Sequence, residues 1–192
     1  MCQYSIVASC FLLAQGLIIA KAEYQKEELY MNWAHVHLML NHIPVVGIGF
    51  AILLLAVAVV RRSHELTNIA LVFVILVSLW AIPAYLTGEP AEEIVEDLPG
   101  VSEELIKEHE EQAEIAFILV EVAGALALIT LIARRYSDNL GQKLVILTLL
   151  VLIISGGLIG WAANLGGKIH HEEIRSDTGL PSLQINKEKE DD

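Results

Sequence analysis

The sequence feature that most constrains the fold is a set of four long apolar stretches. They are 18 to 21 residues long and cover Ile43–Val60, Leu66–Leu86, Ile115–Ala133 and Leu144–Ala163. A bilayer core about 30 Å thick needs roughly 20 residues of α-helix to cross it. The stretches are continuous and lack the two-residue alternation of outer-membrane barrel strands. The sequence therefore predicts an all-α integral membrane protein with four spanning helices.

Basic residues between the stretches predict how the helices are oriented. Arg61 and Arg62 follow the first stretch, Arg134 and Arg135 follow the third, and Lys143 comes soon after. The positive-inside rule places these short loops in the cytoplasm of a bacterial inner membrane. Because each loop is short, it joins two antiparallel helices, and the expected architecture is an up-down-up-down four-helix bundle.

The predicted membrane domain, residues 31–175, has a flanking segment on each side. Residues 1–30 contain a further apolar stretch. This stretch predicts an extra N-terminal helix, an uncleaved signal-like segment or a mis-assigned protein start. Residues 176–192 are polar and acidic, which is typical of a disordered tail.

Acidic side chains dominate the connection between the second and third stretches. Between Glu89 and Glu114 there are eleven acidic residues and one basic residue, Lys107, and the whole chain has a net charge of -12. Such a surface excludes nucleic acid as a partner and favours a basic protein or cations. We expect residues 88–110 to form a charged loop on the outer side of the membrane, together with the C-terminal tail.

Histidines from separate stretches gather at one depth. Counted from the basic loops at about 1.5 Å per residue, five of them reach a level just above the outer surface: His35, His37, His109, His170 and His171. His42 lies 19 residues from Arg61, near the outer edge of the apolar layer. Gly166 and Gly167 are expected to end the fourth helix, so that the next segment folds back towards His109.

Imidazole is a common ligand of iron, copper and zinc. Antiparallel helices can present axial ligands to both faces of a haem. By depth, His109 with His37 or His35 is the best bis-histidine pair. The alternative is a single transition metal with ligands drawn from the set His35, His37, His109 and His171.

Glu121 is the one carboxyl deep in the apolar layer, 13 residues from Arg134. An ionisable group at this depth is costly and indicates a functional site. The alternative is close helix packing, with the carboxyl hydrogen-bonded to a backbone carbonyl or to Ser78.

Four motifs resemble those of a bacterial family: HLMLNHIPVVG, TGEPAEE, HEE and GGKIHHEEIR, within Met31–Arg175. This is a family of four-helix predicted membrane proteins of unknown function that are sometimes suspected of binding haem. The resemblance implies that His42, His109 and His171 match the family's histidines.

The leading hypothesis is a b-type haem or single transition metal at the outer face, held through His42, His109 and either His37 or His171. It would exchange electrons with a periplasmic protein or a membrane complex. One alternative is a non-redox accessory or scaffold subunit with no cofactor. Another is a proton-coupled carrier using Glu121, which would require a homodimer because the four spans show no internal repeat. The sequence has no nucleophile–base pair, phosphate loop or nucleotide motif to favour a hydrolase or kinase, and whether the protein is an enzyme stays open.

Overall fold

The computed structural model describes residues 2–96, 98 and 101–170, with side chains described at Gln15 and from Trp33 to Ile169 within these ranges. Five helices follow one another: α1 (Cys2–Arg61), α2 (His64–Leu86), α3 (Gly88–Val95), α4 (Glu103–Ala133) and α5 (Asp138–His170). The described part of the chain contains no β-strand. This confirms the predicted all-α class.

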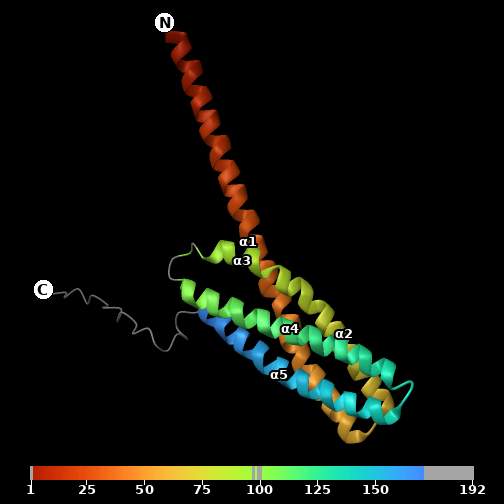
Figure 1. Cartoon of the computed structure of the whole chain (residues 1–192). Helices are drawn as coiled ribbons and strands as arrows, with labels where there is room; N and C mark the ends of the chain where they lie inside the picture. The colour runs from red at the N-terminus through yellow and green to blue at the C-terminus, as the bar shows by residue number, and fades with distance from the viewer. Residues whose placement is uncertain (1, 97, 99–100, 171–192) are drawn as a thin grey trace, which may run out of the picture.

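The four long helices form an antiparallel bundle (Figure 1). Around the bundle, α1 packs against α2, α2 against α4, α4 against α5, and α5 returns to α1. Consequently α1 and α4 face each other across the bundle. Each of the four helices includes a segment long and apolar enough to cross a membrane. The predicted four-helix membrane bundle is thereby confirmed.

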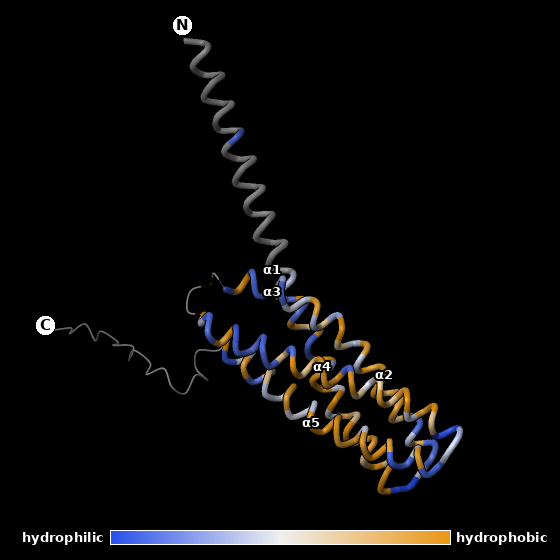
Figure 2. Tube along the Cα trace, viewed as in Figure 1, coloured by the Kyte–Doolittle hydropathy of each residue, from blue (hydrophilic) through white to orange (hydrophobic). Residues whose placement is uncertain are grey.

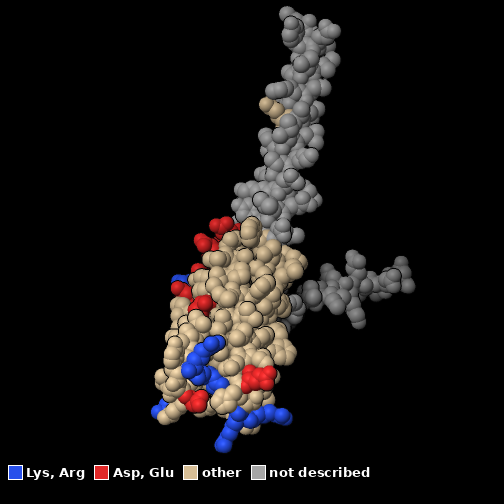
Figure 3. Space-filling view, turned by 90° about the vertical axis from the view of Figure 1, so that its right-hand side faces the viewer, with Lys and Arg blue, Asp and Glu red and all other residues tan. Residues whose placement is uncertain are grey.

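Polarity divides the bundle into an apolar middle and two polar ends (Figure 2). We call one the basic end, because in or beside its α1–α2 and α4–α5 connections lie Arg61, Arg62, Arg134, Arg135 and Lys143. We call the other the histidine end; it contains α3, the first turns of α4, and the residues His37 and His109. On the face shown in Figure 3, most Lys and Arg side chains lie at the basic end.

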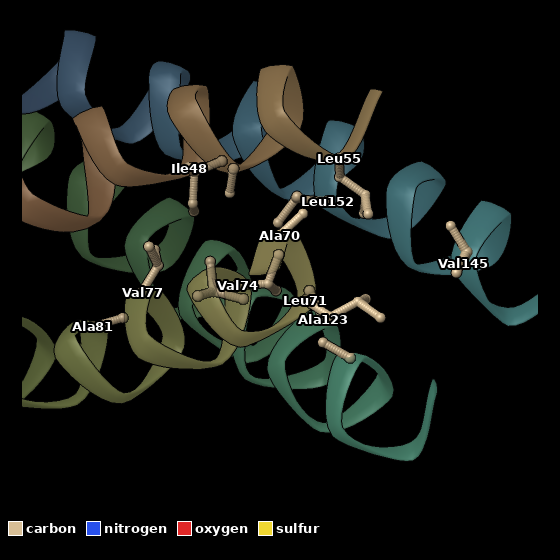
Figure 4. Packing of buried hydrophobic residues seen from close by; sticks show 13 residues of the cluster. Ile48, Leu55, Ala70, Leu71, Val74, Val77, Ala81, Ala123, Val145 and Leu152 are labelled. Carbon is tan, nitrogen blue, oxygen red and sulfur yellow. The ribbon is translucent and has the colours of Figure 1, made fainter. Parts of the chain in front are cut away.

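Small and β-branched residues fill the space between the helices (Figure 4). Ala51, Ala70, Ala123 and Ala127 are fully buried alongside larger residues such as Leu55. Small side chains let helix backbones approach closely, which is the main source of packing energy inside a bilayer. A buried hydrogen bond also joins α4 to α5, with 3.1 Å between the hydroxyl oxygens of Thr130 and Thr148.

The N-terminal segment does not form a separate helix. Its backbone belongs to α1, which runs from Cys2 without interruption and extends away from the bundle (Figure 1). Residues 17–43 contain neither glycine nor proline, so nothing in this stretch favours a turn.

The segment predicted as a long acidic loop is mostly helical. Pro90 lies in the first turn of α3, where its missing N–H costs no hydrogen bond. Ser102 caps α4, its Oγ accepting from the Leu105 amide at 3.4 Å, and acidic residues follow in the first turn. Because of these local start signals, only residues 96–102 connect α3 to α4.

The structure at the paired glycines also differs from the prediction. Gly166 and Gly167 lie inside α5, which continues to His170, so they do not end the helix. The predicted fold-back therefore does not begin at these glycines. His171 and the predicted tail, residues 176–192, lie outside the described residues.

Candidate functional site

His37 is held at the histidine end by α2. Its Nδ1 lies 3.0 Å from the carbonyl oxygen of Ala84 and 3.1 Å from Oγ1 of Thr87. The Thr87 hydroxyl is itself directed at the carbonyl oxygens of Pro83 and Ala84, at 3.0 and 2.9 Å. A carbonyl oxygen can only accept, so the His37 Nδ1 carries the hydrogen and donates it. The lone pair of the neutral ring is then on Nε2.

His109 is held in the same way by α5. Its Nδ1 lies 2.9 Å from the carbonyl oxygen of Ala162 and therefore also donates. The ring lies against Gly166, where an added Cβ would come within 3.2 Å of Cε1 and 3.8 Å of Nε2. Glycine at this position therefore gives the imidazole the space that it occupies.

The two rings belong to opposite helices of the bundle. His37 is on α1 and His109 is on α4, and the two imidazoles lie within electrostatic reach of each other. Within the described residues, neither Nε2 makes a hydrogen bond. The structure thus brings together two half-buried imidazoles with fixed Nδ1–H groups and two uncommitted Nε2 atoms.

A small second core fixes the elements around this pair. Val95 of α3, Ile106 of α4 and Ile169 of α5 are buried together. Ala34 of α1 packs against the same cluster, as do Val101 and Leu105. Because this core joins α3 to the long helices, it holds the backbone at the histidine end in place around the imidazoles.

The other predicted ligands are placed differently. His35 is exposed. His42 is also exposed, and its Nδ1 contacts the carbonyl oxygen of Leu38 on its own helix. Among the residues that the structure describes, no three His, Cys, Asp or Glu side chains are grouped so that they could hold a metal ion.

Glu121 lies on α4 within a segment apolar enough to cross a membrane, and Ser78, one of its two predicted kinds of partner, does not bind it. The Ser78 hydroxyl donates to the carbonyl oxygen of Ile75 at 3.1 Å. Oε1 of Glu121 is buried and has no hydrogen-bond partner within the described part of the protein. An acceptor left unsatisfied at this depth is costly, so the carboxyl remains a candidate functional group.

The residues that fix the imidazoles were missed by the sequence reasoning. The carbonyl groups of Ala84 and Ala162 give no signal in a sequence, because every residue has one. By contrast, the sequence does indicate which histidines face the interior of the bundle. Seven-residue steps from His37 lead to Pro44, Ala51 and Ala58, all buried. The same steps from His109 lead to buried Ala116, Ala123 and Thr130, so each histidine extends a stripe of packed residues.

The chain matches no family model, no curated protein and no solved structure. The geometry of the histidine end is therefore the basis for proposing a function.

Proposed function

We propose that the protein binds a b-type haem between His37 and His109 and transfers electrons to or from a partner protein that docks at the histidine end. The observation that carries the proposal is the pair of imidazoles with fixed Nδ1–H groups and free Nε2 atoms. Metal-bound histidines characteristically donate the second ring N–H to a carbonyl or carboxylate, which fixes the tautomer and the ring orientation. Both rings meet this condition, through the carbonyl oxygens of Ala84 and Ala162.

The number of available ligands favours haem over a single transition metal. A haem iron needs one or two axial protein ligands, because the macrocycle supplies the other four. A zinc or copper site usually needs three or four protein ligands. Two imidazoles on facing helices therefore fit a haem, whereas the described residues do not gather a third ligand. The bound haem would supply the one-electron chemistry.

The chain's own residues would orient and modify this site. The carbonyl groups of Ala84 and Ala162 hold the two rings and increase the basicity of Nε2. The surface beside the site is strongly acidic: Glu92 on α3 lies close to Glu110 on α4 and to its own neighbours Glu89 and Glu96. A partner with a basic surface would be attracted to this end, and its association would weaken as ionic strength rises. By the positive-inside rule, this end is the periplasmic one.

The first test is an absorbance spectrum of the detergent-purified protein from cells supplied with haem, oxidised and then reduced with dithionite. We expect a Soret band that shifts on reduction and resolved α and β bands, with one haem per chain by extraction. A sample without stoichiometric haem that remains monodisperse would contradict the proposal.

That contrary result would favour a second candidate function, a non-redox accessory subunit. One observation supports it: the same imidazoles connect helices, His37 joining α1 to the end of α2 and His109 joining α4 to α5. Interhelical hydrogen bonds inside a membrane contribute about 0.6–2 kcal/mol each. In this alternative the histidines stabilise the bundle directly and bind no cofactor.

A further inference from the structure

A cavity of about 550 Å³ lies at the basic end, far from the histidine pair. It is formed between α2 and α4, and its lining residues are His64, Asn68, Val72, Leu128, Leu131, Ile132, Arg134 and Arg135. The cavity plays no part in the function proposed above.

The lining changes from polar to apolar along the bundle. The polar residues lie where α2 begins and α4 ends. The apolar wall begins within one turn of the rim and reaches about two turns further into the membrane, where Val72, Leu128 and Ile132 are 46%, 50% and 51% exposed. A bilayer would cover these side chains, so the cavity opens towards lipid on its apolar side. This order of a charged rim above an apolar wall matches the order of a phospholipid, from headgroup to acyl chain.

Arg134 is already positioned at the polar rim. Its Nε donates to Oδ1 of Asn68 at 3.1 Å, and its Nη2 lies 3.1 Å from Nδ1 of His64. These contacts leave Nη1 uncommitted. A guanidinium held in place by two neighbours loses little side-chain entropy when it binds a phosphate.

The charge around the rim is also favourable to an anion. Arg134 and the adjacent Arg135 make no ion pair with a carboxylate within the described residues. The basic end as a whole carries five cationic residues against the acidic Glu65 and Asp138. Basic pockets between membrane helices are a recognised way to bind anionic lipid headgroups.

We propose that this cavity binds an anionic phospholipid, with the phosphate at Arg134 and Arg135 and one acyl chain along Val72, Leu128 and Ile132. Charge complementarity selects the phosphate, and charge-assisted hydrogen bonds from Nη1 of Arg134 and from the Arg135 guanidinium make the contact strong. The apolar wall selects a lipid over a free anion, because inorganic phosphate would leave that wall uncovered.

Native mass spectrometry of the full-length protein in detergent tests the proposal. The probes are phosphatidylglycerol and phosphatidylcholine with identical acyl chains. We expect phosphatidylglycerol to bind the wild-type protein at least about fivefold more tightly, the effect of roughly one favourable cation–lipid contact. Equal affinity for the two lipids would overturn the proposal.

Two double variants separate the cavity from general surface charge. Arg134→Gln with Arg135→Gln removes two cations from the rim, whereas Arg61→Gln with Lys143→Gln removes two from the same end outside the lining. The first should lose the preference for phosphatidylglycerol and the second should keep it. An equal loss in both would show attraction by net charge and would overturn the proposal.

Two further variants keep the test informative if loss of Arg134 disturbs folding. Arg135→Gln alone changes an exposed side chain, and Val72→Phe narrows the cavity without changing its charge. Each should weaken phosphatidylglycerol binding, and unchanged binding in both would contradict the assignment. Displacement of the lipid by an equal concentration of inorganic phosphate would instead identify a free-anion site and overturn the lipid assignment.

Discussion

Alanine at either His37 or His109 is expected to abolish the haem absorbance of the purified protein. Each variant removes one of the two Nε2 atoms that the proposal assigns to the haem iron. His35→Ala and His42→Ala are matched controls, because both side chains are exposed on the same helix as His37. These two variants should retain the full absorbance, measured against protein concentration after size-exclusion chromatography. Loss of the chromophore in His42→Ala, with retention in His37→Ala, would contradict the ligand assignment.

A chemical rescue distinguishes ligation from a structural role of His109. His109→Gly leaves a space beside Gly166 that can admit free imidazole. Added imidazole should restore the chromophore in this variant, because it can supply the missing ligand without the link to the helix backbone. Under a structural role, imidazole would restore no absorbance.

Gly124→Ala is expected to lower the free energy of unfolding by about 1–3 kcal/mol, the usual cost of overpacking a close interface. The added Cβ would lie 2.0 Å from Oγ and 2.6 Å from Cβ of Ser78 on α2. The Ser78 hydroxyl can rotate away, but its Cβ cannot, so α2 and α4 must move apart. Denaturant-induced unfolding in detergent micelles, followed by circular dichroism, measures the change.

Two controls locate the effect at the α2–α4 contact. Gly157→Ala and Gly160→Ala introduce the same methyl group on α5, where nothing lies within 4 Å, and should leave stability equal or higher. Ser78→Gly combined with Gly124→Ala should recover most of the lost stability, because it removes the opposing Cβ. Equal stability of the Gly124→Ala and Gly157→Ala variants would contradict the close contact between α2 and α4 at Ser78 and Gly124.

The architecture could be predicted because its determinants are local in the sequence. Four uninterrupted apolar stretches set the number and length of the membrane helices, and the pairs Arg61–Arg62 and Arg134–Arg135 mark two tight connections. The structure of the polar connection at the histidine end was harder to predict. Its acidic composition suggested a loop, yet Pro90 and the capping Ser102 start helices on either side of a short link.

The site could be predicted only in part, because its geometry depends on which face of each helix points inward. In a membrane helix both faces are apolar, so the usual contrast between a buried and a solvated face is missing. Depth alone grouped His35, His37 and His109, but could not separate the exposed His35 from the half-buried His37. The stripe of small residues in phase with His37 carries that information, since small residues mark helix contacts.

The hydrogen bonds that fix the two imidazole rings could not be predicted from the sequence. They join His37 to Ala84, 47 residues away, and His109 to Ala162, 53 residues away. Such contacts follow from the order of the helices around the bundle, which determines that α4 has α2 and α5 as its neighbours. The position of Glu121 along its apolar stretch predicted that its carboxyl would be buried. The sequence could not predict that the Ser78 hydroxyl would bind the Ile75 carbonyl and leave Oε1 of Glu121 without a partner.

The most direct test of the central claim is electron paramagnetic resonance of the oxidised, purified wild-type protein at low temperature. Two imidazoles bound to one ferric haem give a low-spin spectrum, which is the result that the pairing of His37 with His109 predicts. A high-spin ferric spectrum, indicating one protein ligand, would contradict the paired site. So would the absence of any ferric haem signal from a folded, haem-supplied sample.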